Sequence, residues 1–361
     1  MEFISPIFDL YSDYLIVNQG QNTSTGLSNL LDNKISHDSI TRSLSNSDYS
    51  SKDLWSVVKP FAQQISFPDA VLVLDDTIEE KAYMDENDLI AWHYDHCIKR
   101  SVKGINQLTA LYHSQDISLP ICFTMIHKTE WVTDKKTGKS KRISAISKQA
   151  IFRQLIKQSI TNNLVFAYVL ADSWFSAAEN FNFIQDLNRL FIMPLKTNRK
   201  VFLSQQDKLS GVYQSIESLE LKDNQTLQVW VEGVGFPLLL LKQAFQNKGG
   251  TEGVLYLVTN DLTADAQRIK LFYSKRWKIE EFHKSVKSNT GYATSPAHTV
   301  RTQTNHLFLS MLAFVKLESL KISTKKNHFA IKKLLAFNAL KIAWKNLQVL
   351  KESNSLLNQC A

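Results

Sequence analysis

The sequence predicts an α/β protein in which a mixed β-sheet is flanked by helices, with a β-rich insertion and an N-terminal helical domain. Three observations predict this fold class. From about residue 67 onward, short apolar runs of β-favouring residues are interspersed with stretches of helical periodicity. Residues 1–66 contain only helical patterns. Residues 196–265 then return to β-like alternation within the α/β pattern.

Charge is the most informative feature of the composition. The 361 residues suffice for two or three domains, and 44% apolar with 21% charged residues is ordinary for a globular protein. The net charge of +8 is concentrated in two blocks. Residues 99–157 hold 12 basic and 3 acidic residues, and residues 266–361 hold 17 basic and 4 acidic residues. Any single block can be a solvated surface, but two such blocks favour a nucleic acid as partner.

The cysteines and apolar runs indicate a cytoplasmic protein. Cys97, Cys122 and Cys360 are far apart and form no CxxC pair, which argues against a zinc ribbon or a disulfide framework. The acidic stretch MEFISPIFDLYSDY does not fit a signal peptide. No uninterrupted apolar run approaches the length of about 18 residues that a membrane span requires.

Three helices are expected in the N-terminal segment. The first covers Pro6–Val17, the second covers 26–31, and the third follows Ser36, which is placed to cap it, and runs to Leu44. A short helix, a turn and a capped helix resemble a helix-turn-helix. Residues 1–66 carry 4 basic and 7 acidic residues, however, which is poor for a DNA-binding surface. A DNA-binding domain and a helical packing domain both remain open.

Aspartates follow two predicted buried strands. Residues 71–74, VLVL, lead into Asp75 and Asp76, and residues 165–170, VFAYVL, lead into Asp172. Side chains at the C-terminal ends of buried strands are well placed to meet a ligand. Each aspartate has an alternative role, because it can cap the turn or helix that follows its strand.

The other elements complete the pattern of the core. They are strands at 105–112, 119–126 and 190–195 and helices at 148–160, 177–187 and 305–320. The order strand, strand, strand, helix, strand, helix, strand, then a helix bearing a glutamate, is that of an RNase H-like core. The β-like segments of the insertion are 227–234, 237–241 and 253–259. The cluster WHYDHC at 92–97 fits no standard metal-site spacing, so loop or core packing is expected there.

The glutamate helix, LFYSKRWKIEEFHKSVK at 271–287, lacks Pro and Gly and has helical apolar spacing. At about 100° per residue, Tyr273, Arg276, Glu280 and Lys287 fall within about 60° of one another. A carboxylate among a phenol, a guanidinium and an ammonium suits a metal-bound carboxylate beside anion-binding groups. Ordinary i,i+4 pairs on a charged face are the alternative.

The spacing of these four residues resembles the Y-(2)-R-(3)-E-(6)-K signature of the insertion sequence 4 family of bacterial DDE transposases. The motif ADSWF around Asp172 resembles the second-aspartate motif of that family. In that family the first catalytic aspartate directly precedes a threonine. This favours Asp76 as the first catalytic aspartate here and leaves Asp75 as the alternative. Glu281 lies about 100° away from the four residues, so Glu280 is the better third carboxylate. The resemblance covers about residues 72–287.

The resemblance implies a cut-and-paste transposase. Asp76, Asp172 and Glu280 would be the catalytic residues and would bind two Mg²⁺ or Mn²⁺ ions, since three carboxylates repel one another unless cations are bound. Such a pair of ions activates a water or a 3′-hydroxyl and stabilises the leaving oxygen of a phosphodiester. No nucleotide cofactor is expected, because the GKS at 138–140 lacks the earlier glycine of a P-loop.

The resemblance also implies which residues bind DNA. Tyr273, Arg276 and Lys287 would contact phosphates near the cut, and Lys284 lies on the same predicted helix. Some relatives use a tryptophan of the insertion to hold a flipped base, and Trp230 is the residue in that region, although a tryptophan in a strand is more often part of the core. The basic loop 134–142 is either a contact to the DNA backbone or a solvated hairpin tip.

The implied partners are double-stranded DNA, as terminal inverted repeats and as target, and a second copy of the chain when assembled on DNA. Neither a membrane nor a nucleotide is expected, and the protein would be associated with the bacterial nucleoid when bound to DNA. Two other functions are open: an inactive or domesticated DNA-binding protein, and a structure-specific nuclease that cuts but never joins. The helix expected at 329–350 can cover the core, contact DNA or pair two protomers.

These inferences divide the chain into five segments. They are a helical, DNA end-binding domain (1–66), the first part of the core (67–195), the β-rich insertion (196–265), the second part of the core with the glutamate helix (266–320) and a basic C-terminal helical region (321–361).

Overall fold

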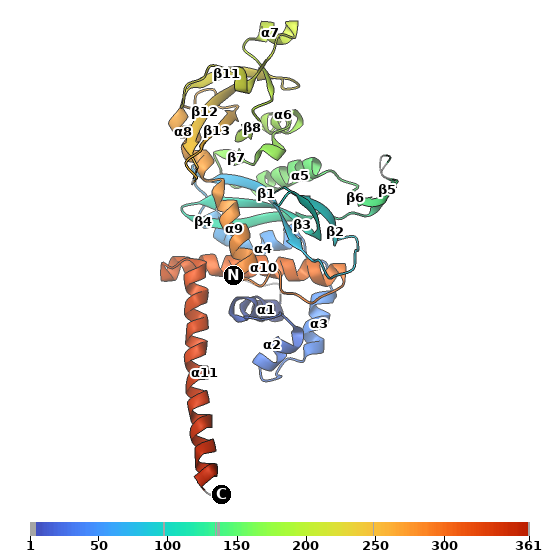
Figure 1. The fold of residues 1–361 in the computed structure, drawn as a ribbon, viewed down its shortest axis with the longest axis vertical. Helices are drawn as coiled ribbons and strands as arrows, with labels where there is room; N and C mark the ends of the chain where they lie inside the picture. The colour runs from blue at the N-terminus through green and yellow to red at the C-terminus, as the bar shows by residue number, and fades with distance from the viewer. Residues whose placement is uncertain (1–4, 97, 134, 136–137, 248, 360–361) are drawn as a thin grey trace. The chain divides into compact units, whose positions relative to one another are not determined.

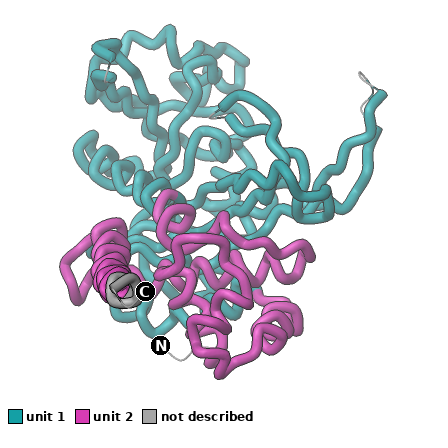
Figure 2. The backbone as a smooth tube through the Cα atoms, turned by 60° about the horizontal axis from the view of Figure 1, so that its bottom comes forward, with its two compact units in different colours: residues 1, 50–283 teal, residues 2–49, 284–361 magenta. Residues whose placement is uncertain are grey.

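The computed structural model divides the chain into two units (Figure 2). The first unit holds Ser50–His283, and the second holds Lys284–Ala361 together with the N-terminal segment up to Tyr49. The structure describes residues 5–96, 98–133, 135, 138–247 and 249–359, with side chains up to residue 352. Cys97 and Cys360 therefore lie outside the described residues, whereas Cys122 is buried with a free thiol.

A sheet of 11 strands forms the centre of the first unit (Figure 1). Its strands are β1 (Val71–Glu80), β2 (Ala91–Asp95), β3 (Arg100–Ser114), β4 (Ile117–Met125), β7 (Tyr168–Leu170), β8 (Leu190–Leu195), β9 (Lys200–Phe202), β10 (Gln214–Ser215), β11 (Thr226–Val231), β12 (Leu238–Gln246) and β13 (Glu252–Thr259). Their order is β10-β9-β11-β12-β13-β8-β7-β1-β3-β2, and β4 also pairs with β3. A separate hairpin joins β5 (Glu130–Thr133) to β6 (Ser140–Ile143).

The middle of this sheet has the expected RNase H-like arrangement. Strand β1 pairs antiparallel with β3, and β3 pairs antiparallel with β4. On its other side β1 is parallel to β7, which is parallel to β8. The helix α5 (Lys148–Thr161) comes between the antiparallel and the parallel strands in sequence. The continuous apolar runs that predicted β1 and β8 are buried, as strands covered on both faces must be.

The insertion extends the core sheet. Strands β11, β12 and β13 form consecutive antiparallel pairs, and β13 pairs with β8 of the core. Residues 196–265 are therefore β-rich, as expected, and they share backbone hydrogen bonds with the core. The cluster at 92–97 falls mainly in β2, where His93 is buried, in agreement with the expected packing role.

Five further helices belong to the first unit in whole or in part. They are α4 (Ser51–Gln64), α6 (Ala178–Asp186), α7 (Gln205–Ser210), α8 (Ala266–Ser274) and α9 (Trp277–Asn289). Helix α4 begins with a capping box formed by Ser50 and Asp53. Its Ser51 hydroxyl donates to the carbonyl of Phe123 on β4, which joins α4 to the sheet.

The second unit is helical. Its helices are α1 (Pro6–Val17), α2 (Ser24–Leu30), α3 (His37–Ser45), α10 (Val300–Thr324) and α11 (His328–Gln359). The three N-terminal helices are confirmed, and Ser36 caps α3 by accepting the Ser39 N–H at 3.2 Å. No helix that the structure describes has both the length and the apolar character that crossing a membrane requires.

Hydrogen bonds to α10 explain why the N-terminal helices separate from α4. The Tyr11 hydroxyl lies 3.0 Å from His306 Nδ1, and the Asn305 amide donates to the carbonyls of Leu44 and Ser47. All of these residues belong to the second unit. The boundary at residues 49 and 50 thus divides the segment 1–66, because α1 and α3 bond to α10, and α2 bonds to α3, while α4 bonds to the sheet.

Candidate active site

Strand β1 is longer than its apolar run, which places both aspartates inside it. Pairing with β3 continues past Asp75, which is opposite Thr109, to Glu80. Pairing with β7 stops earlier, at Val73. Asp75 and Asp76 therefore lie just beyond the point where the parallel neighbour ends, and they point to opposite faces of the strand.

The prediction of a single helix over 271–287 is wrong. The chain forms two helices, α8 and α9, with a tight turn between them. The N–H groups of Lys275 and Arg276 bond to carbonyls three residues back, on Phe272 and Tyr273, at 3.1 and 2.9 Å. Such bonds wind the chain more tightly than an α-helix does. Tyr273 thus precedes the turn, and Glu280 follows it.

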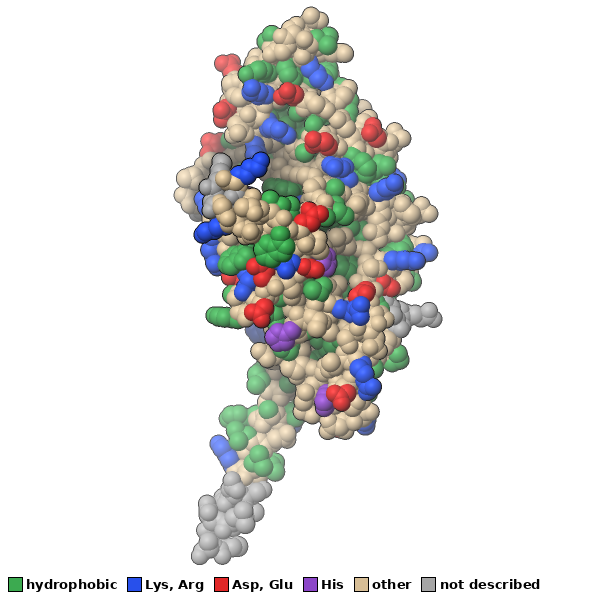
Figure 3. Space-filling model, turned by 90° about the vertical axis from the view of Figure 1, so that its right-hand side faces the viewer, with side chains coloured by type: hydrophobic (Ala, Val, Ile, Leu, Met, Phe, Trp, Pro, Cys, Tyr) green, Lys and Arg blue, Asp and Glu red, His purple; other side chains and the backbone are tan. Residues whose placement is uncertain are grey.

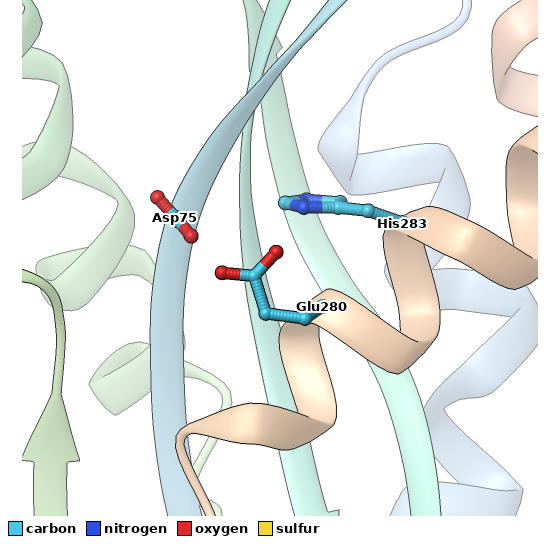
Figure 4. Close-up of side chains that lie close together, drawn as sticks. All are labelled: Asp75, Glu280 and His283. Atoms are coloured by element: carbon cyan, nitrogen blue, oxygen red, sulfur yellow. The ribbon is translucent and has the colours of Figure 1, made fainter. Parts of the chain in front are cut away.

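Three potential metal ligands converge on one face of β1 (Figure 4). Asp75 projects from β1, and Glu280 and His283 project toward it from α9. One ligand atom from each of the three lies within 4.8 Å of the others. The Arg276 guanidinium is 3.3 Å from Glu280 Oε1 and 3.8 Å from Asp75 Oδ2, so it bridges the two carboxylates.

Asp76 lies on the other face of β1, near α5. Its Oδ2 is 2.8 Å from Nζ of Lys148, the first residue of that helix. Asp76 is therefore absent from the group formed by Asp75, Glu280 and His283. The metal-ligand role expected for Asp76 stays a prediction.

Asp172 is close to both aspartates of β1. Its Oδ1 accepts the Trp174 N–H at 3.0 Å, so the capping role left open by the sequence is present. Burial raises the pKa of Asp172, as does the charge of Asp76, while the Trp174 N–H and Arg276 oppose the rise. Burial likewise raises the pKa of Asp75 well above its ordinary value, and the charges of Asp172, Asp76 and Glu280 add to the effect. Crowded carboxylates of this kind favour a bound cation.

The other expected DNA-binding residues are distributed more widely. Burial raises the pKa of Tyr273 to about 12, so its phenol is protonated at neutral pH beside Arg276. Lys287 is in the last turn of α9, and Lys284 Nζ lies 5.3 Å from the centre of the Phe329 ring. Both lysines belong to the second unit. Trp230 is on β11, half-buried and paired with Phe202.

Comparisons with known proteins identify the family. A model described as DDE superfamily endonuclease matches residues 8–216, and one described as transposase DDE domain matches residues 129–315. Each match spans more than half of the chain. The chain belongs to the DDE superfamily of transposases and endonucleases.

The other comparisons are more distant. This DDE protein matches the Drosophila P element transposase strand transfer complex at 10% identity and a TM-score of 0.26, over 52% of this chain and 37% of that one. It matches Argonaute from Kluyveromyces polysporus with a guide RNA at 12% identity and a TM-score of 0.23. This match covers 78% of this chain and 32% of the Argonaute chain. The chain thus spans about a third of the length of these proteins, and its strand order, not these likenesses, establishes the fold. No curated protein matches it.

Two residues that the structure places at the candidate site, His283 and Lys148, were not predicted from the sequence. His283 follows Glu280 by three residues, about one helical turn, so the spacing E-x-x-H on the expected helix was an available signal. Lys148 had no such signal, because it reaches Asp76 through the packing of α5 beside β1.

Proposed function

We propose that this protein is a transposase of the insertion sequence 4 family that binds insertion-sequence ends and catalyses metal-dependent DNA cleavage and strand transfer. The observation that carries the proposal is the convergence of β1 and α9 carboxylates on Arg276 within a chain of the DDE superfamily. Double-stranded DNA is the substrate, both as terminal inverted repeats and as target.

We assign metal binding to Asp76, Asp172 and Glu280. Asp75 is the alternative to Asp76, because it lies on the face of β1 that meets Glu280, whereas the assignment of Asp76 rests on its position directly before Thr77. Carboxylate oxygens suit Mg²⁺ or Mn²⁺. When bound, a pair of these ions would activate the attacking hydroxyl and stabilise the leaving oxygen.

The remaining groups would position the DNA. Arg276 can donate to a phosphate from the edge of the carboxylate group, and the protonated Tyr273 phenol offers a neutral donor beside it. Lys287, two turns beyond Glu280 on α9, and Lys284 would extend these contacts along the backbone. We place end recognition in α1–α3, whose capped α3 supports a helix-turn-helix role. Trp230 remains proposed as the base-holding tryptophan.

Metal removal gives the first test of this proposal. The protein should cut DNA carrying its element ends only with Mg²⁺ or Mn²⁺, because the reaction depends on the cations that the carboxylates hold. Either ion should also raise the melting temperature of the DNA-free protein, since a ligand that binds the folded state stabilises it. Full cleavage activity in excess chelator would refute the metal assignment.

Helix α11 supports the proposed homodimer. Phe337, Leu340, Trp344 and Leu347 recur at intervals of three, four and three residues, which is the spacing of a helix–helix seam. All four side chains are exposed, and Figure 3 shows hydrophobic side chains along this helix. Apolar surface of this extent is rare on a monomer and marks an interaction site. We propose that α11 pairs with α11 of a second copy.

Breaking this seam should give monomers. The double substitution Leu340→Glu and Leu347→Glu places charges on the proposed seam, whereas Lys341→Glu and Lys345→Glu change residues beside it. Analytical ultracentrifugation of the protein bound to element-end DNA should show two copies per complex for the wild type and the lysine control and one copy for the leucine variant. A leucine variant that dimerises like the wild type would show that α11 does not pair the protomers.

A further inference from the structure

Strands β5 and β6 form a two-stranded ribbon that is separate from the central sheet (Figure 1). Trp131 pairs with Arg142, and Val132 pairs with Lys141. Every residue of β5 is exposed, and Trp131 and Val132 are 59% and 42% exposed. An isolated two-stranded ribbon is only marginally stable in water. This ribbon therefore needs an anchor to the rest of the chain, and its exposed surface can receive a partner.

Arg142 anchors the ribbon at its base. Its guanidinium donates to the Asp88 carboxylate and, at 3.1 Å, to the carbonyl of Lys128, and it lies 4.8 Å from the centre of the Trp131 ring. The Lys128 N–H in turn donates to the Asp88 carbonyl at 2.8 Å. These contacts hold the start of the ribbon in place, but they leave β5 exposed along its length.

The ribbon and the residues that flank it are strongly basic. Residues 128–142 hold 6 basic and 2 acidic residues. Lys135, Lys139 and Lys141 are all exposed. Such a surface complements a polyanion, and it would repel a second copy of this chain, whose own net charge is +8. Charge complementarity therefore favours a nucleic acid over a protein as the partner of the ribbon.

Cationic groups continue from the ribbon toward the candidate active site. Burial lowers the pKa of Lys128, and the charges of Lys148 and Lys141 lower it further, while Glu86 opposes them. Lys148 itself is 2.8 Å from Asp76 at the candidate active site. Positive charge thus extends from β6 through Lys128 to the carboxylates of β1, and an anion that lies along it would relieve the repulsion between these lysines.

We propose that the β5–β6 ribbon is a DNA-binding element that contacts the phosphate backbone of duplex DNA independently of its sequence. This inference rests on the proposed function, because it takes DNA as the polyanion. The major groove of B-DNA is about 12 Å wide and admits a two-stranded β-ribbon. Lys139 and Lys141 would bind phosphates as point charges. Phosphate contacts position a protein on the duplex but carry no sequence information.

The salt dependence of DNA affinity tests the inference without reference to cleavage. Fluorescence anisotropy would measure the affinity of the full-length, metal-free protein for a random duplex and for a duplex carrying the sequences that flank the gene, across a series of salt concentrations. Lys139→Ala combined with Lys141→Ala should lower the slope of log affinity against log salt by about 2, because each phosphate contact contributes about 0.9 to that slope. The decrease should be the same on both duplexes.

Two further variants provide a control and a test of opposite sign. Lys157→Ala combined with Lys222→Ala removes two exposed lysines outside the ribbon and should leave the slope close to that of the wild type. Ser140→Lys adds a positive charge at an exposed position of β6 and should raise the slope by about 1. All of these variants should melt close to the wild type, because the substituted side chains are exposed.

Several results would overturn the inference. They are an unchanged slope in the Lys139 and Lys141 variant or in Ser140→Lys, and an equal decrease in the Lys157 and Lys222 variant. A decrease confined to the flanking-sequence duplex would overturn the sequence-independent contact. An unchanged slope with fewer copies of the chain per DNA complex in sedimentation would assign the ribbon to a protein–protein contact instead.

The fate of the proposed function can be read from the wild type in the same experiments. A wild type that binds and cuts DNA, alongside any result that overturns the inference, would leave the proposed function standing. A wild type that binds neither duplex would remove both.

Discussion

Glu280→Gln is expected to abolish cleavage of element-end DNA while DNA binding stays near the wild-type level or tightens slightly. Glutamine keeps the size of the side chain but loses the charge that holds a metal ion. Metal ions contribute several kcal/mol to stabilising the transition state, and about 1.4 kcal/mol corresponds to a tenfold change in rate. The rate of single-turnover cleavage should therefore fall by about 10³-fold or more. Binding can tighten because a negative charge beside the phosphates is removed.

The neighbouring residue provides the control for this prediction. Glu281 is paired with Lys278, at 3.0 Å, and its side chain is 55% exposed, away from Arg276. Glu281→Gln should leave cleavage within a few-fold of the wild type. An inactive Glu281→Gln together with an active Glu280→Gln would show that the register taken from the Y-(2)-R-(3)-E-(6)-K spacing is wrong.

Asp76→Asn should likewise reduce cleavage by about 10³-fold, since it removes a proposed metal ligand, whereas Asp75→Asn should retain cleavage within about tenfold. Burial and neighbouring carboxylates raise the pKa of Asp75, and its oxygens are engaged by the Asp76 N–H and by Arg276. Full activity of Asp76→Asn with loss of activity in Asp75→Asn would place the metal instead among Asp75, Glu280 and His283.

The raised pKa of Asp75 also has a consequence for stability. Because its pKa is higher in the folded than in the unfolded protein, the folded state binds the extra proton, and stability is lost as the pH rises above the ordinary aspartate pKa. Thermal unfolding of the metal-free protein across this range should show the loss in the wild type. Asp75→Asn should show less of it and should melt higher at neutral pH.

Local signals in the sequence were sufficient for most of the core. The runs at 71–74 and 190–195 predicted β1 and β8, and the Ser36 cap predicted the start of α3, because burial on both faces and capping each leave a mark within a few residues. The turn between α8 and α9 has no local sequence signal, because no Pro or Gly lies at or beside Lys275 and Arg276.

Tertiary packing decided the rest of the site. Which face of β1 meets α9 determines whether Asp75 or Asp76 approaches Glu280, and this depends on packing between segments about 200 residues apart in the sequence. The same holds for the approach of Lys148 to Asp76. The packing of the N-terminal helices against α10 could not be predicted from local patterns either. It depends on hydrogen bonds of buried polar residues such as Asn305 and His306, which no periodicity in the sequence distinguishes.

A strand-transfer assay tests the central claim most directly. Labelled DNA carrying the sequences that flank the gene would be incubated with a target plasmid, the purified protein and Mg²⁺, and the products would be sequenced across the junctions. The proposed function predicts 3′-ends of the element joined covalently to target DNA by the wild type and by Glu281→Gln, and no joined product in chelator or with Glu280→Gln. Cleaved ends that are never joined would contradict it and indicate a nuclease, and end binding without cleavage would indicate a DNA-binding protein that has lost the reaction.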